Sequence, residues 1–456
     1  MELGEYYTKL RRSTFIRSVA VLAGGTALSQ LIMVLVLPIL TRIYTPEDFS
    51  VLAVYTAALS IFSVAACFRF DIAIPMPKRD EEAVSLLILA LIGACFSSFV
   101  LLIISFVFPL AVTSTLGKPA LSGMLWLIPA GVLLTSSYGA LQAWNTRKKQ
   151  FVEVSRTRMA QALAGASTQV GCGLLGNIPS GLLFGQMLSA GAGALGLGYR
   201  LARNERGMLK SVRLANLWSV CCQYHRFPKY STLEALTNSA AIQVPLIIIA
   251  AREIGPEAGY LMLAMRIIQA PMGLIGSAIS QVYVSRAAEE FRINRLNIFT
   301  GKILEGLLKS GVGPIILFGA IAPKVFELVF GSEWQRAGQL VTWMTPWFVM
   351  QFLASPISMA LHVTGNQRIA LLLQIFGFLS RVGMVMTATH LIGGFVSEVY
   401  AISGFVFYFI YLTVILRVSC ISFSAAMASF KVAFPVLMAW TVLSVASVFL
   451  CQIKIW

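Results

Sequence analysis

Basic side chains within long apolar segments are the residues of this sequence best placed to do chemistry. Arg266, Lys309 and Arg381 are the three basic residues that fall inside such segments. A charge near the centre of a bilayer costs about 2.5 to 3.5 kcal/mol on insertion scales, so it needs a partner or an aqueous cavity. The Lys309 stem can reach the cytoplasmic surface, which favours an anchoring role. We interpret Arg266 and Arg381, which lie deeper, as cavity residues that bind an anionic substrate, with Lys309 as a weaker candidate.

Acidic residues near the inner ends of apolar segments are candidates for a counter-ion or a coupling site. Glu234, with Asn238 one turn later on the same helix face, can pair with a buried arginine. Arg69 and Asp71 lie at the inner end of another segment, where residues two apart on a helix do not face each other. Arg69 is therefore either a site for a phosphate at the cytoplasmic mouth or a boundary anchor. Glu234 or Asp71 can carry a coupling ion, for which H⁺ and Na⁺ both remain open.

Catalytic and metal-binding motifs are absent from the sequence. The three histidines, His225, His362 and His390, are expected in a cytoplasmic loop, at an inner boundary and at an outer boundary, so they cannot converge on one nucleophile. No G-x-x-x-x-G-K-[ST] phosphate loop occurs, and the Cys221-Cys222 pair lacks a metal-ligand spacing. We therefore predict a protein that is not an enzyme and that has no metal and no cofactor other than a coupling ion.

The composition is that of a polytopic membrane protein. Of the 456 residues, 57% are hydrophobic and 12% charged, whereas a soluble domain has about 25% charged residues. A span needs about 20 apolar residues, and thirteen such segments can be counted, which predicts an all-α fold with twelve to fourteen transmembrane helices. Their approximate limits are 16–40, 50–68, 84–110, 120–142, 159–176, 178–199, 231–250, 258–284, 303–322, 340–361, 369–389, 395–416 and 432–452.

The basic residues are distributed unequally between alternate loops. With the N-terminus in the cytoplasm, the inner segments hold 26 Lys and Arg residues and the outer segments hold 6. This is the positive-inside bias, and it accounts for most of the net charge of +16 without a polyanionic partner. We predict a multi-pass protein with a cytoplasmic N-terminus that does not bind nucleic acid.

A short repeat relates the two halves of the chain. Arg42 and Pro46, followed by Glu, recur as Arg252 and Pro256, again followed by Glu, 210 residues later in an equivalent external turn. Two halves of six spans each would have the same orientation, which predicts two six-helix bundles in a parallel repeat around a central cavity. The expected domains are a bundle at 1–213 that includes a cytoplasmic connector, a bundle at 214–422, and an additional C-terminal helix within 423–456.

Several patches of the sequence resemble bacterial polysaccharide flippases, the Wzx-type O-antigen translocases of the MOP exporter superfamily. The matching patches cover nearly the whole chain and include Thr41–Phe49, Phe70–Lys78, Phe227–Tyr230, Gly255–Tyr260, Arg266–Pro271, Ile279–Val282, Phe330–Trp334, Ser355–Pro356 and Thr364–Gly365. The sequence departs from the family pattern in two features. Ser50 stands where Gly is usual, and the segment 432–452 makes a thirteenth span where twelve or fourteen spans are common.

The resemblance implies a protein of the bacterial inner membrane that carries a polyprenyl-pyrophosphate-linked oligosaccharide outward. The cargo would be a repeat unit of O-antigen, capsule or exopolysaccharide, and a cationic central cavity would open alternately to each leaflet. The resemblance also places Arg266 where related lipid II flippases have a cavity arginine. Membrane lipid is an implied partner, as are a polysaccharide polymerase and chain-length machinery.

Two other classes of function remain as alternatives. A multidrug or small-molecule exporter of the MATE type would share the fold but should favour acidic cavity residues for cationic drugs, and this chain has few. A membrane glycan polymerase or ligase needs a sizeable external loop. The longest external loop expected here, Ala322–Gln339, has 18 residues and no pairing of a base with a nucleophile. Both classes are disfavoured, the enzyme more strongly.

Overall fold

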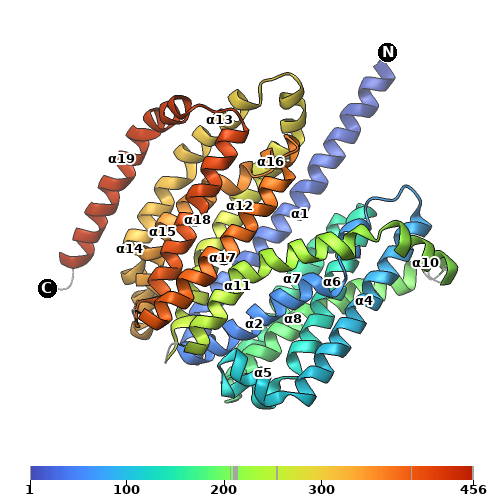
Figure 1. Cartoon of the computed structure of the whole chain (residues 1–456), viewed down its shortest axis with the longest axis horizontal. Helices are drawn as coiled ribbons and strands as arrows, with labels where there is room; N and C mark the ends of the chain where they lie inside the picture. Colours follow the sequence, from blue (N-terminus) through green and yellow to red (C-terminus); the bar gives the residue numbers. More distant parts are fainter. Residues whose placement is uncertain (1, 206, 209–213, 253–254, 392, 454–456) are drawn as a thin grey trace. The chain divides into compact units, whose positions relative to one another are not determined.

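The computed structural model describes residues 2–205, 207–208, 214–252, 255–391 and 393–453 (Figure 1). These residues form helices joined by short connections, and no strand occurs among them. Backbone groups in a bilayer core must be hydrogen-bonded within their own segment, which explains why long apolar segments adopt helices. The expected all-α fold is therefore confirmed.

The chain forms two compact units, Met1–Gln243 and Val244–Trp456, called here the N-terminal and the C-terminal unit. The division falls within helix α11 (Thr232–Arg252). The domain boundaries expected after residues 213 and 422 stay predictions, as does the parallel repeat of two six-helix bundles.

The N-terminal unit has its core where α4, α6, α8 and α10 meet, and Leu86, Trp144 and Leu197 are buried there. The first turn of α2 shows how local sequence starts a helix. Thr45 Oγ1 accepts a hydrogen bond from the Asp48 backbone N–H, and an Asp48 carboxylate oxygen accepts one from the Thr45 backbone N–H, with Pro46 at the first helical position. The elements are α1 (Glu2–Ile43), α2 (Pro46–Ala66), α3 (Phe70–Ala73), α4 (Asp80–Val107), α5 (Pro109–Leu116), η1 (Pro119–Met124), α6 (Leu127–Arg147), α7 (Phe151–Leu174), α8 (Ser180–Asn204), α10 (Leu214–Gln223), η2 (Phe227–Ser231) and the start of α11.

The C-terminal unit has its core around α13, α15 and α18, where Leu304, Phe352 and Phe407 are buried. Close helix contact there depends on glycine: a Cβ atom on Gly338 would lie 2.6 Å from the Ala322 carbonyl oxygen, so α14 and α15 could not approach as they do. The elements are the end of α11, α12 (Glu257–Arg292), α13 (Leu296–Leu307), η3 (Leu308–Val312), α14 (Gly313–Phe330), η4 (Ser332–Trp334), α15 (Gln335–Ala354), η5 (Ser355–Ile357), α16 (Ala360–Val363), α17 (Gln367–Leu391), α18 (Val396–Val418) and α19 (Phe423–Ile453).

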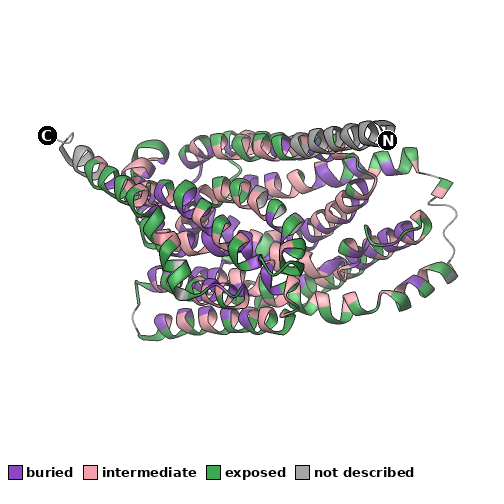
Figure 2. Cartoon of the chain, turned by 90° about the horizontal axis from the view of Figure 1, so that it is seen from above, coloured by how far each residue is buried: buried purple, intermediate pink, exposed green. Residues whose placement is uncertain are grey.

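Ten helices among the described residues are long and apolar enough to cross a membrane. The other three expected spans, 120–142, 159–176 and 340–361, overlap α6, α7 and α15, which are long helices outside that set of ten. Figure 2 shows exposed residues along most of the helices. Large apolar side chains are among the exposed residues, for example Phe99, Leu195 and Phe434, each more than 60% exposed. Faces of this kind fit contact with lipid chains. The total of twelve to fourteen spans stays a prediction.

Candidate functional site

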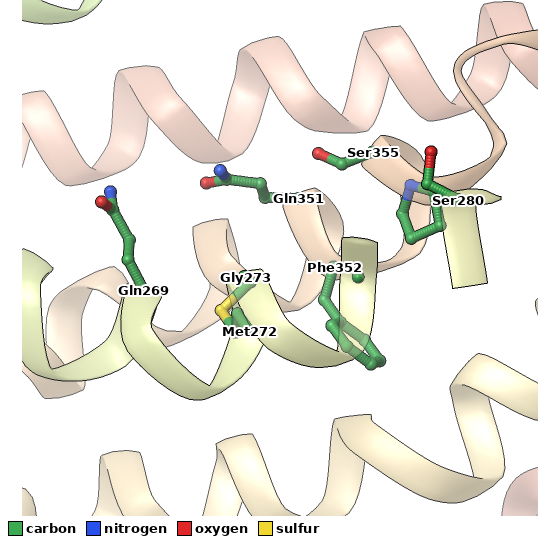
Figure 3. A pocket seen from close by; sticks show the side chains of 9 residues that line it. Gln269, Met272, Gly273, Ser280, Gln351, Phe352 and Ser355 are labelled. Carbon is green, nitrogen blue, oxygen red and sulfur yellow. The ribbon is translucent and has the colours of Figure 1, made fainter. Parts of the chain in front are cut away.

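A pocket with a volume of about 420 Å³ lies in the C-terminal unit, between α12 and the end of α15 with η5 (Figure 3). Figure 3 shows the Gln269 and Gln351 side chains reaching toward the same space from the two sides. The lining residues are Gln269, Met272, Gly273, Gly276, Ser280, Gln351, Phe352, Ser355 and Pro356.

The spacing of residues along α12 explains why this helix forms one wall. Gln269, Gly273, Gly276 and Ser280 follow each other at intervals of four, three and four residues, so they share one face of the helix. A Cβ atom on Gly273 or Gly276 would meet no heavy atom within 4 Å beyond its own helix turn. The α12 backbone is therefore open to the pocket at these two positions, and a ligand can approach it closely.

Arg266 continues the same face of α12, three residues before Gln269. Its side chain is half-buried. Pro271 follows five residues later within the same helix and has no backbone N–H to donate. The pocket lining itself contains no charged side chain, so the face runs from a cationic residue to a neutral polar surface. The role of Arg266 in binding an anion stays a prediction.

The polar groups of the pocket are amides and hydroxyls. Gln351 Oε1 is buried and has no hydrogen-bond partner among the described residues, so it can accept a hydrogen bond from a ligand. The amides of Gln269 and Gln351 both donate and accept, as do the hydroxyls of Ser280 and Ser355. Such a set can recognise the hydroxyl groups of a sugar. Neither Gln269 nor Gln351 was identified as a site residue from the sequence, although small and polar residues at helical spacing in an apolar segment were a usable signal.

Arg381, the second predicted cavity arginine, is buried inside the C-terminal unit. Arg381 is only 2% exposed. Its guanidinium carbon lies 4.5 Å from the Phe407 ring centroid and 5.4 Å from the ring centroids of Trp347 and Tyr408. Its Nε and Nη2 atoms have no hydrogen-bond partner among the described residues. Arg381 is absent from the lining of the pocket, and three aromatic faces surround its charge.

Lys309 is exposed and lies in η3, where its ammonium group pairs with Glu305 Oε1 at 2.6 Å, one turn earlier. This arrangement is that of a surface ion pair. Glu234 is exposed in the first turn of α11, and its pairing with a buried arginine stays a prediction.

Arg69 and Asp71 lie in a turn rather than on a continuous helix. α2 ends at Ala66, and Phe68 and Arg69 both adopt positive φ angles, 50° and 58°, before the short helix α3. Arg69 Nε and Asp71 Oδ1 are buried without a hydrogen-bond partner among the described residues. Burial raises the pKa of the Asp71 carboxyl above its ordinary value, and the nearby Arg69 charge partly opposes this rise. Their roles in phosphate binding and ion coupling stay predictions.

The two turns related by the short repeat contain similar ion pairs. Pro46 begins α2 and Pro256 caps α12, while Arg42 and Arg252 are both exposed. The next residue, Glu47 or Glu257, pairs with a basic side chain: Lys118 Nζ lies 2.7 Å from Glu47 Oε1, and Arg336 Nε lies 3.0 Å from Glu257 Oε1. These two ion pairs were not predicted from the sequence. Among the described residues, no cluster of His, Cys, Asp and Glu could hold a metal ion.

Solved structures with a similar fold are membrane transporters. The lipid II flippase MurJ, in an inward closed conformation, is similar with a TM-score of 0.69 and 12% identity over 94% of this chain and 96% of that chain. An outward-facing multidrug resistance MATE family transporter of the MOP superfamily has a TM-score of 0.57 and 14% identity, over 89% of this chain and 96% of that chain. A MOP superfamily transporter from Pyrococcus furiosus has a TM-score of 0.55 and 16% identity over the same fractions, 89% and 96%. No curated protein matches the chain.

The family comparison covers both units. The model of the family described as polysaccharide biosynthesis protein matches residues 39–339, a range that includes Arg266 and the whole α12 wall of the pocket. The family expected from the sequence is thus confirmed as a polysaccharide biosynthesis family, and the solved structures confirm the fold. The chain is a multi-pass membrane protein that belongs to the polysaccharide biosynthesis protein family.

Proposed function

We propose that this protein flips a polyprenyl-pyrophosphate-linked oligosaccharide from the cytoplasmic to the outer leaflet of the bacterial inner membrane. The observation that carries the proposal is the continuous face of α12, on which Arg266 precedes a neutral pocket lined by amides, hydroxyls and two open glycines. The pyrophosphate would meet Arg266 through charge-assisted hydrogen bonds, and the sugar would occupy the pocket. Family membership and the similarity to a structure named as a lipid II flippase support this assignment.

The transport cycle in this proposal is alternating access, with the N-terminus in the cytoplasm. The polyprenyl tail stays in the lipid while the polar head passes through the protein, because moving the tail from lipid into water would cost free energy. H⁺ or Na⁺ drives the cycle without a nucleotide. Membrane lipid surrounds the protein, and a polysaccharide polymerase with its chain-length machinery receives the product.

The multidrug alternative is weaker because of the chemistry of the pocket. A pocket for cationic drugs calls for a carboxylate, and none of the residues that line this pocket is acidic. The polymerase or ligase alternative has no base beside a nucleophile in the described pocket, whose polar groups are amides and hydroxyls.

The location of lipid-linked glycan in a deletion strain tests the proposal. Complete repeat units should accumulate on the inner leaflet, and a plasmid that carries the wild-type gene should restore export. Arg266→Ala at matched expression should restore it poorly. A matched control is Arg286→Ala, which removes an exposed arginine from the same helix. Single units already exposed on the outer leaflet of the deletion strain would contradict flipping and favour the polymerase.

A further inference from the structure

The pocket between α12 and the end of α15 carries polar side chains along its whole length, and all of them are neutral. Gln269 and Gln351 contribute amides, and Ser280 and Ser355 contribute hydroxyls. In Figure 3 the Gln269 amide lies at one end, the two serine hydroxyls lie at the other, and the Gln351 amide lies between them. The other lining residues that the structure describes are apolar or glycine. A ligand can therefore form hydrogen bonds throughout the pocket without meeting a charged side chain of the lining.

The length of the α12 wall sets the size of the ligand. From Gln269 to Ser280 the helix rises by about 16 Å, at 1.5 Å per residue. Gly273 and Gly276 lie on this wall and carry no side chain, so a sugar ring can lie against the helix backbone there. The volume of about 420 Å³ falls in the usual range of small-molecule sites. The pocket is longer than one sugar ring, so more than one sugar unit can lie along it.

The basic residue of α12 that lies next to the pocket is Arg266, three residues before Gln269. In the proposed function this charge is matched by the pyrophosphate of the carrier lipid. Beyond Gln269, the described wall of α12 offers glycine backbone, Met272 and the Ser280 hydroxyl. The sugar units that follow the pyrophosphate therefore lie beside a wall without a cation.

The buried cation of α17 does not change this environment. Arg381 is only 2% exposed and does not line the pocket. Its guanidinium carbon faces the rings of Trp347, Phe407 and Tyr408 at 4.5 to 5.4 Å. Its charge is stabilised by these aromatic faces, and its buried Nε and Nη2 atoms are not presented to a ligand in the pocket.

Neutral and acidic sugars differ in how they match this lining. The hydroxymethyl group of a hexose both donates and accepts, and the buried Gln351 Oε1, which has no partner among the described residues, can accept its hydrogen bond. A uronic acid has a carboxylate in place of that group, and at neutral pH a carboxylate only accepts. Moving such a charge out of water into a site without an opposite charge is unfavourable. The Gln351 oxygen would also repel it.

We propose that the pocket selects neutral saccharide units and rejects acidic units such as uronic acids, and that Gln351 is the main residue that sets this preference. The inference rests on the proposed function, because it takes the ligand to be the saccharide of a lipid-linked pyrophosphate. The preference applies to the sugar units nearest the pyrophosphate, which are the units that the pocket holds.

A comparison of two probes in proteoliposomes tests the preference. Both are fluorescent polyprenyl-pyrophosphate-linked disaccharides, and they differ only in the second sugar, which is glucose in one and glucuronic acid in the other. At equal concentration the wild type should transfer the glucose probe at least about tenfold faster. Equal rates, or faster transfer of the glucuronic acid probe, would overturn the inference and leave flipping intact. Transfer of neither probe by folded wild-type protein would overturn the proposed function and this inference with it.

Charge substitutions then assign the preference to the pocket. Gln351→Lys should lower the ratio of the two rates several-fold, because the added cation pairs with the carboxylate of the acidic probe. Gln269→Lys places the same charge at an exposed position of the other wall, where folding tolerates it, and should act in the same direction. Gln339→Lys is the matched control, since Gln339 is exposed on α15 and does not line the pocket. A ratio that stays at the wild-type value in both pocket variants, or that falls equally in Gln339→Lys, would overturn the assignment.

Discussion

The guanidinium carbon of Arg381 lies 4.5 Å from the centroid of the Phe407 ring, inside a unit where the arginine is almost wholly buried. Trp347 and Tyr408 face the same charge at 5.4 Å. Cation–π contacts are worth about 2 kcal/mol or more when they are desolvated. The aromatic faces therefore stabilise a charge that would otherwise be costly at this depth.

The first prediction concerns this arginine. Arg381→Lys should lower the free energy of unfolding by about 1 to 3 kcal/mol, because a lysine ammonium cannot stack its charge over three rings as a planar guanidinium does. Thermal unfolding in detergent measures the change, and Arg368→Lys, at an exposed position near the start of the same helix, is the control. Unchanged stability together with lost flipping would instead assign Arg381 to substrate binding.

The second prediction concerns Gln351. Gln351→Met should keep or raise the unfolding temperature. The substitution removes a buried oxygen that has no partner among the described residues, and such an unpaired oxygen destabilises the wild type by about 1 kcal/mol. The same change should reduce flipping, because the pocket loses an acceptor for sugar hydroxyls. Reduced stability with unaltered flipping would show that the amide has a structural role and no role in binding.

The third prediction concerns the charged cluster that Glu257 of α12, Arg336 of α15 and Glu398 of α18 form. Arg336→Gln should destabilise the protein by about 2 to 4 kcal/mol, because it leaves two carboxylates facing each other without a cation. The double variant Arg336→Gln with Glu398→Gln should recover part of this loss. Lys118→Gln should cost about 1 kcal/mol or less, because Glu47 is half exposed. Additive effects of the two substitutions in the double variant would contradict the shared pairing.

The fourth prediction concerns pH and Asp71. The pKa of Asp71 is raised in the folded protein, so the folded state binds this proton more tightly than the unfolded state does. Protonated Asp71 stabilises the folded state fully at pH values below the ordinary pKa of aspartate. This stabilisation is lost as the pH rises through the pKa of Asp71 in the folded protein. Asp71→Asn should therefore reduce the loss of stability at neutral pH, while Asp71→Glu keeps a titrating carboxyl. Unfolding temperatures across a pH series measure this, and equal pH dependence of wild type and Asp71→Asn would contradict it.

The sequence allowed the helices to be predicted well because each one is a local property of an apolar segment. The turn at Pro46 and its counterpart at Pro256 were also predictable, since proline and the acidic first turn act within a few residues. The location of Arg266 within a long helix also followed from its position in an apolar segment. Gln269 shares the helix face of Arg266, and helical spacing relates the two residues.

The contacts that could not be predicted join residues distant in the sequence. Gln351 meets the wall formed by Gly273 and Gly276 only because α15 packs on α12, and no local pattern relates the faces of two helices. The pairing of Arg336 with Glu398 has the same origin. The backbone conformation of Arg69 could not be predicted for another reason. A positive φ angle at a residue other than glycine is rare, and tertiary packing imposes it here.

Filling the pocket offers the most direct test of the central claim, that the face of α12 conducts a lipid-linked glycan. Gly276→Leu places a side chain in open space within the pocket, whereas Gly306→Leu makes the same change on α13, where a Cβ atom also meets no neighbour. The measurement is the transfer of a fluorescent polyprenyl-pyrophosphate-linked saccharide between leaflets of proteoliposomes that contain each folded variant. We expect Gly276→Leu to abolish transfer and Gly306→Leu to match the wild type. Equal transfer by all three proteins would contradict it.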